Sequence, residues 1–288
     1  MDIESKKFLG QPKNFISIFN ALLFDGQPVL KPEYLKDENS ELVMNVSSKH
    51  VDIIKRYEDG TYLDLFVIES QSYVDPSMVA RVMEYESVAR MRYIRQNFKK
   101  HVPMHTRLPM ILTVVLYVGE SKWNAAKRLS ELEIIHPGFE DMFNEFKLNL
   151  IELNTNHKYN TGEKATQDFF DLLRMIYRKQ ILKEDLDREF NRDALYFAYV
   201  VTKNKELLNI YQESEKGDVK VCRALDEMFE ESTNKGIQMG IKQGIEQGIA
   251  LNQFEVYQTM LDKGFSVKAI ASIFSVSEES IKTLLMKA

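Results

Sequence analysis

Two stretches near residue 60 have the residue types and spacing of β-strands. Residues 50–57 and 62–72 are rich in Val, Ile, Leu, Phe and Tyr. Residues 58–61, Glu-Asp-Gly-Thr, form a turn sequence with a glycine available for positive φ. The pattern predicts a β-hairpin. Its second strand contains the continuous apolar run 65–68, which is typical of a strand covered on both faces in an α/β layer structure.

Asp52 and the triplet Glu69-Ser70-Gln71 lie on these two predicted strands. A turn centred on residues 59 and 60 places Asp52 opposite Val67, so that Glu69 is a diagonal neighbour roughly 7–8 Å away at the Cα atoms. Glu69 and Gln71 share a face because strand side chains repeat every two residues. Two carboxylates at this separation can bind one hard cation such as Mg²⁺ or Mn²⁺. The alternative is that Glu69 ends the strand facing water or pairs with an arginine.

Helices are predicted for most of the remaining chain. A helix beginning near Asp75-Pro76 places Arg81 and Tyr85 one turn apart on a single face. Strands are expected at 109–118, buried within the sheet, and at 147–153, closing it. Helical periodicity also marks residues 164–178, 182–202, 219–230, 253–263, 267–274 and 278–286, the last with Ser277 as N-cap.

Residues 236–249 contain four Gly-Ile pairs at four-residue spacing. Glycine costs an isolated helix roughly 1 kcal/mol relative to alanine. A stripe of glycines lets a second helix approach closely, so we expect a self-associating helix, with a flexible linker as the alternative. Residues 265–281 resemble a helix-turn-helix. Its last helix offers few side chains suited to reading bases, which favours packing or oligomerisation for this end of the chain.

Composition limits the classes of protein to consider. Of the 288 residues, 44% are hydrophobic and 28% are charged, as in an ordinary globular protein. A single cysteine excludes an intramolecular disulfide and suits a reducing cytoplasm, and five histidines argue against a zinc framework. The longest apolar run, 110–118 with Thr113 allowed, is too short to cross a bilayer. We therefore expect a cytoplasmic protein with no membrane partner.

Charge is unevenly distributed along the chain. The net charge is −5, yet residues 87–119 contain no Asp or Glu. Four basic residues in that stretch, Arg92, Arg95, Lys99 and Lys100, are candidates for contacts with DNA phosphates, which supply most of non-specific affinity. The alternative is that these residues do not contact DNA and lie only on a solvated helix face and in the loop that follows it.

Several motifs together resemble the Rpn-type recombination-promoting nuclease and putative transposase family, a branch of the PD-(D/E)XK nuclease superfamily. The most specific is Glu69-x-Gln71 followed by Met78-x-x-Arg81-x-x-x-Tyr85. The others are residues 19–26, Asp52, residues 68–75, residues 114–120, Trp123 and the glycine-rich and helical end after residue 230. The resemblance implies an α/β, restriction-endonuclease-like core, with a mixed sheet flanked by helices and an α-helical C-terminal extension. It also implies Mg²⁺-dependent cleavage of DNA with low sequence specificity, linked to recombination or transposition.

The resemblance also assigns roles to individual residues. Asp52 matches the metal-binding Asp of the superfamily, Glu69 its Asp/Glu, and Gln71 the position usually held by Lys. Glu41 matches an acidic residue that can assist the metal. An amide can orient water or bond a phosphate oxygen, but it lacks the charge that a lysine directs at the transition state. A non-catalytic DNA-binding or oligomeric protein descended from such nucleases is therefore the second hypothesis, and a metal-independent structural protein is the third.

Arg81 and Tyr85 complete the expected site. Arg81 either orients Glu69 or holds the substrate backbone, because an arginine facing the sheet needs a carboxylate or a phosphate. Tyr85 either supports that face or simply packs in the core. We divide the chain into a nuclease-like domain at 1–155, a helical segment at 156–230, the repeat at 231–250 and a small helical unit at 251–288. We expect a homodimer formed through the repeat or the helical C-terminal region.

Overall fold

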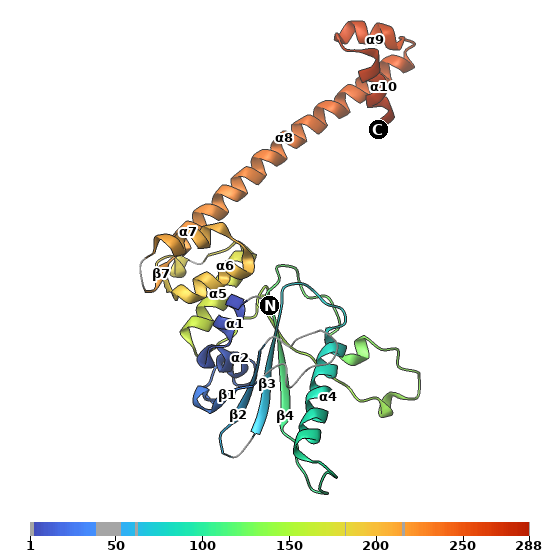
Figure 1. The fold of residues 1–288 in the computed structure, drawn as a ribbon. Helices are drawn as coiled ribbons and strands as arrows, with labels where there is room; N and C mark the ends of the chain where they lie inside the picture. Colours follow the sequence, from blue (N-terminus) through green and yellow to red (C-terminus); the bar gives the residue numbers. More distant parts are fainter. Residues whose placement is uncertain (1–2, 39–52, 61–62, 182, 215–216, 288) are drawn as a thin grey trace. The chain divides into compact units, whose positions relative to one another are not determined.

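The computed structural model describes residues 3–38, 53–60, 63–181, 183–214 and 217–287 (Figure 1). The chain forms two compact units, Met1–Asp226 and Glu227–Ala288. Each unit is described by itself below. The finer division at residues 155, 230 and 250 stays a prediction.

The first unit is built on a five-stranded mixed sheet with strand order β1-β2-β3-β4-β5. The strands β1, β2 and β3 are antiparallel, whereas β3, β4 and β5 are parallel. Their bounds are Leu35–Asp37, Ile53–Glu58, Leu63–Gln71, Met110–Tyr117 and Asn149–Glu152. The expected α/β class is confirmed. The strand β1, too short to produce a pattern, was not predicted.

The hairpin of β2 and β3 forms, but its predicted register is wrong by two residues. Val67 pairs with Ile54, and the last pair before the turn is Glu58 with Leu63. The connection therefore spans the four residues 59–62 and not a two-residue turn centred on 59 and 60. Asp52, for which we expected the Val67 pairing, lies outside the described residues.

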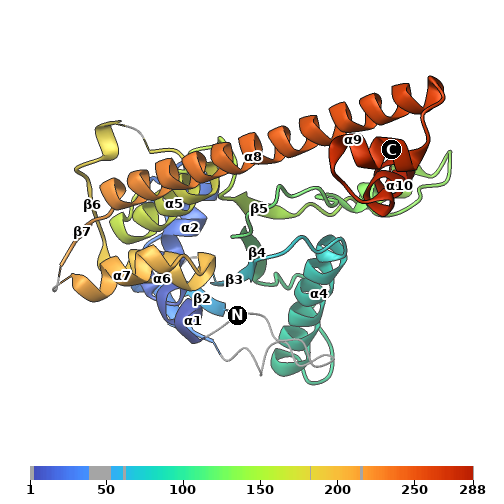
Figure 2. The same cartoon turned by 90° about the horizontal axis from the view of Figure 1, so that it is seen from above.

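Helices cover both faces of the sheet. On one face, Tyr85 and Ala89 of α4 (Met78–Asn97) pack in a cluster with Leu65 and Val67 of β3. On the other face, Phe19 of α2 (Pro12–Phe24) stacks on Phe66, with ring centroids 4.7 Å apart. Figure 2 shows α4 and α2 on opposite sides of the sheet. Because strand side chains alternate, Glu69 and Gln71 lie on the face covered by α4.

Further helices pack behind α2. They are α1 (Ile3–Leu9), α5 (Lys164–Arg178), α6 (Arg192–Thr202) and α7 (Lys205–Glu213). Ser17 of α2 donates a 2.9 Å hydrogen bond to Thr166 of α5. Short 3-10 turns lie at Pro32–Tyr34, Leu129–Glu131, Glu140–Met142 and Lys183–Asp185.

Two of the helices expected after residue 180 begin later than predicted. The helix expected at 182–202 starts at Arg192, because the Asn191 side chain accepts from the backbone N–H groups of Asp193 and Ala194 and caps it. The preceding β6 (Glu189–Phe190) pairs with β7 (Val219–Lys220). That pairing also explains why the helix expected at 219–230 begins at Cys222.

The helix α8 (Cys222–Asp262) begins in the first unit and continues into the second. The Gly-Ile repeat is helical throughout, and its four isoleucines are 54–58% exposed. The helices α9 (Val267–Phe274) and α10 (Glu278–Lys287) follow and pack on the end of α8 around Tyr257, Ile270 and Ile281. Ser277 accepts a 3.1 Å hydrogen bond from the Ser280 N–H, which confirms the predicted N-cap. Among the described helices, none has the length and apolar content needed to cross a membrane.

Candidate functional site

Two polar side chains are buried near the carboxyl end of β3. Glu69 is 4% exposed and Gln71 is 5% exposed. Both face α4, and their partners on the parallel strand β4 are Val115 and Tyr117. Burial of a charged or hydrogen-bonding group is costly unless a partner compensates it. The contacts of these two side chains therefore define the site.

Arg81, in the first turn of α4, is the ion-pair partner of Glu69. Its Nη2 donates to Glu69 Oε1 over 3.0 Å. Its Nη1 donates to Asp75, and its Nε and Nη2 donate to the Tyr85 hydroxyl over 3.0 and 2.9 Å. The predicted shared face of Arg81 and Tyr85 is confirmed. Of the alternatives for Glu69, pairing with an arginine is the one observed.

Asp75 anchors this arrangement from the loop before α4. Its carboxylate accepts from the N–H and the hydroxyl of Ser77 over 2.8 and 2.7 Å and also accepts from Arg81. Burial raises the pKa of Asp75, but the hydrogen bonds from Ser77 and Arg81 outweigh it and the net pKa is lowered. Burial lowers the pKa of Arg81, and its bonds to Asp75 and Tyr85 reverse the effect, so the guanidinium stays charged. Sequence reasoning assigned Asp75 only to a helix start, although Asp-Pro-Ser is also a typical local side-chain capping sequence.

Tyr85 has both of the roles considered for it. Its ring is 6% exposed and packs with Leu65, Val67 and Ala89. Its hydroxyl oxygen accepts from Arg81. Burial raises the pKa of Tyr85, so the phenol stays protonated at neutral pH and can fix the guanidinium by accepting its hydrogen bonds.

The Gln71 side-chain amide is the second buried polar group of the site. Within the part of the chain that the structure describes, its Nε2 has no hydrogen-bond partner. Its backbone carbonyl accepts from the Val118 N–H over 2.8 Å, which fixes the position of the strand end. Leaving a buried donor without a partner costs about 1–3 kcal/mol. A phosphate oxygen or a water molecule could accept from this amide.

The described part of the strand end contributes one carboxylate that could bind a hard divalent cation. The carboxylate of Glu69 is the kind of ligand that Mg²⁺ and Mn²⁺ prefer. Asp52 and Glu41, the other predicted metal ligands, lie outside the described residues. Asp52 immediately precedes Ile53, whose partner on β3 is Ile68. Among the residues that the structure describes, no group of three or more His, Cys, Asp or Glu side chains is placed to bind a metal.

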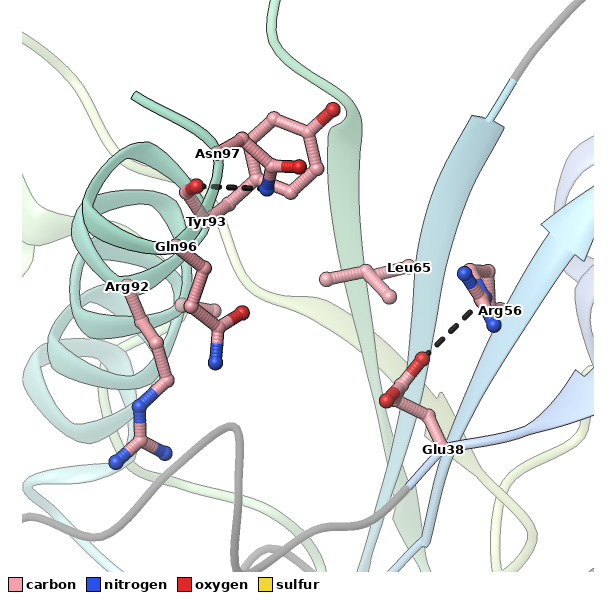
Figure 3. A pocket seen from close by; sticks show the side chains of 8 residues that line it. Glu38, Arg56, Leu65, Arg92, Tyr93, Gln96 and Asn97 are labelled. Atoms are coloured by element: carbon pink, nitrogen blue, oxygen red, sulfur yellow. Dashed lines mark hydrogen bonds and ion pairs between the residues drawn. The ribbon is translucent and has the colours of Figure 1, made fainter. Parts of the chain in front are cut away.

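Of the residues predicted to contact phosphate, Arg81 lies beside Glu69, whereas the four in the basic stretch lie away from it, toward and beyond the other end of α4. Arg92 lines a pocket of about 320 Å³ between α4 and the sheet, with Tyr93, Leu65 and Arg56 among the other lining residues (Figure 3). Arg92 follows Arg81 by eleven residues, about 16 Å along a helix axis. Leu65 precedes Glu69 by four residues, about 13 Å along a strand. Farther along the chain, Arg95, Lys99 and Lys100 are exposed. The site therefore has a carboxylate end and a basic end on one side of the sheet.

One comparison with known proteins identifies the family. A family model described as "Putative transposase, YhgA-like" matches residues 29–207, more than half of the chain. The chain belongs to this family. The match confirms the resemblance to the putative transposase family, and the matched range includes Glu69, Gln71, Arg81 and the basic stretch. Neither the curated proteins nor the solved structures contain a match to this chain.

Proposed function

We propose that this YhgA-like family member is a metal-dependent DNA endonuclease of the PD-(D/E)XK type. It would hydrolyse phosphodiester bonds with little sequence specificity during transposition or recombination. The observation that carries the proposal is the buried carboxylate of Glu69 at the end of β3, paired with Arg81 and next to the Gln71 amide. Among the described residues the Gln71 amide donor has no partner, and a buried polar group of this kind calls for a functional explanation.

The proposal gives each candidate site residue a role. Glu69 and Asp52 would hold Mg²⁺ or Mn²⁺, with Glu41 assisting. A bound divalent cation polarises the phosphate and lowers the pKa of the attacking water. Gln71 would donate to a phosphate oxygen or orient the water. Arg81, fixed by Asp75 and Tyr85, would hold Glu69 or the scissile phosphate.

The arrangement of the sheet supports the fold assignment. An antiparallel hairpin, β2 and β3, leads through α4 into the parallel strand β4. Glu69 and Gln71 lie near the carboxyl end of β3, where α/β proteins commonly bind ligands. The basic residues at the other end of α4 would contact DNA backbone on one side of the cut, since a duplex extends well beyond 16 Å.

A second candidate function is DNA binding without efficient cleavage. The observation that favours it is the neutral amide at position 71, because an amide cannot supply the charge of a lysine. Under this proposal a homo-oligomer of the protein would bind DNA through the same surface, and a divalent metal would contribute little to the affinity.

Nicking of supercoiled plasmid separates the two functions. Purified protein would be incubated with Mg²⁺, Mn²⁺ or EDTA beside the variants Asp52→Ala and Glu69→Ala, with binding to the same DNA measured by filter retention. Cleavage that requires metal and disappears in both variants supports the nuclease. Binding without cleavage at saturating Mn²⁺ supports the second candidate.

A further inference from the structure

We propose that Arg81 supplies the positive charge that a lysine at position 71 would otherwise direct at the scissile phosphate. The inference rests on the proposed nuclease function and assigns the cation of that site. Gln71 occupies the usual lysine position and is neutral. Arg81 is a permanently charged side chain whose Nη2 lies 3.0 Å from Glu69 Oε1.

Arg81 and the side chain at position 71 reach the same space. Glu69 and Gln71 are two residues apart on one face of β3, about 7 Å at their Cα atoms. The Arg81 guanidinium is in hydrogen-bond contact with the first of them, from the helix that covers that face. A phosphate that accepts a bond from Gln71 beside Glu69 would therefore lie within reach of Arg81.

The guanidinium is held in place independently of Glu69. Asp75 accepts from Nη1, and the Tyr85 hydroxyl accepts from Nε and Nη2. If Glu69 turns its oxygens toward a divalent cation, the contacts with Asp75 and Tyr85 keep the guanidinium in position. The N–H of Nη2 that bonded Glu69 can then donate to a phosphate. A positively charged group fixed before the reaction stabilises developing negative charge without reorganisation. The Arg81 side chain is also 16% exposed, so an incoming phosphate can reach it.

The alternative is that Arg81 is only a positioning residue that orients Glu69. The two roles differ in what a lysine at position 71 can replace. A lysine there restores a charge near the phosphate, but it cannot restore the contacts with Asp75 and Tyr85. Rescue of an Arg81 variant by Gln71→Lys therefore distinguishes them.

The experiment compares four proteins with the parent: Arg81→Ala, Gln71→Lys, the double variant, and Arg223→Ala as the charge-matched control. Arg223 is 70% exposed and pairs with Asp187 on the surface, far along the chain from Glu69.

Two quantities are measured on one duplex: the single-turnover cleavage rate with Mn²⁺, and the affinity by fluorescence anisotropy in EDTA. We expect Arg81→Ala to lower the rate about 100-fold or more. The affinity in EDTA should also fall for Arg81→Ala. The double variant should recover to within about tenfold of the parent in rate and should also recover affinity.

Three results would overturn the inference. The double variant could cut as slowly as Arg81→Ala, or Arg81→Ala could cut at the parent rate. The third is that Arg81→Ala and the parent bind DNA with equal affinity in EDTA. Thermal unfolding checks that each protein is folded. If Arg81→Ala does not fold, Arg81→Gln, which removes the charge but keeps a long side chain with donor groups, gives the same comparison with and without Gln71→Lys. If the parent does not cut DNA, the proposed function fails, and the affinities in EDTA still decide whether Arg81 contacts phosphate.

Discussion

The guanidinium of Arg81 and the carboxylate of Glu69 form a 3.0 Å ion pair in which the two side chains are 16% and 5% exposed. Removing one member of a buried pair commonly costs about 3–5 kcal/mol, because the other charge is left in a poorly solvated place. In this protein Asp75 shares the guanidinium, so it can compensate Arg81 when Glu69 is changed. The pair links the end of β3 to the first turn of α4 and so sets the geometry of the candidate site.

Replacing Asp75 with Asn should loosen Arg81 without changing the size of the side chain. We expect a loss of about 1–3 kcal/mol in the free energy of unfolding, because a charge-assisted hydrogen bond is lost. The lowered pKa of Asp75 makes this contribution full above about pH 4, the unfolded-state value, and removes it as pH falls through the folded-state pKa. Urea unfolding of parent and variant between pH 7 and pH 3 tests this. A difference that grows at low pH would contradict it.

Removing the Tyr85 hydroxyl should separate its two roles. Tyr85→Phe keeps the ring among Leu65, Val67 and Ala89 and removes only the acceptor for Arg81. We expect it to cost about 1 kcal/mol of stability, whereas Tyr85→Ala should cost about 3–5 kcal/mol through the cavity it leaves. Denaturant unfolding gives both values. Equal losses would show that packing contributes nothing beyond the hydroxyl.

The exposed basic residues should affect DNA binding and leave stability unchanged. Lys99→Ala with Lys100→Ala removes two positive charges just after the end of α4. If both contact phosphates, the slope of log affinity against log salt should fall by about two, and affinity should fall for every sequence tested. The exposed pair Lys6 and Lys7, changed to alanine together, is the matched control. An unchanged salt slope would mean that the basic stretch is only a solvated surface.

Glycines of the repeat should be replaceable within the helix. Among the described residues, an added Cβ at Gly240 or Gly244 meets no atom within 4 Å beyond its chain neighbours and the adjacent backbone of its own helix. Alanine at either position should therefore stabilise α8 locally by about 1 kcal/mol, seen as a higher melting temperature in far-UV circular dichroism. If the predicted homodimer uses the glycine stripe, the same changes should weaken self-association in sedimentation equilibrium, and Gln243→Ala should not. A parent that is monomeric at all concentrations would refute that use of the stripe.

Much of the fold follows from patterns among residues that are close together in the sequence. The apolar run 65–68, the turn residues after Glu58 and the helical period of 164–178 each specify an element with little help from distant residues. The face shared by Arg81 and Tyr85 also follows from helical spacing alone. The N-cap at Ser277 is a local hydrogen bond and was predictable for the same reason.

Features that depend on distant contacts were not predictable. The hairpin register is set by a four-residue connection, and turn residues alone do not distinguish it from a two-residue turn. The pairing of β6 with β7 joins segments about thirty residues apart, which no periodicity reveals. Asp75 became part of the site only because the loop before α4 turns its carboxylate toward Arg81. The separation of the basic residues from Glu69 likewise depends on the direction of α4 along the sheet.

The most direct test of the proposed nuclease is the rate at which parent protein and Glu69→Gln cleave the same duplex in single-turnover conditions across a Mn²⁺ series. Glutamine keeps the size and hydrogen-bonding shape of the side chain but removes the charge that holds a divalent cation. We predict metal-dependent cleavage by the parent and a rate at least about 100-fold lower for Glu69→Gln at every concentration. Cleavage by the variant at the parent rate, or cleavage by neither protein when both are folded and bind the duplex, would contradict the assignment of this site.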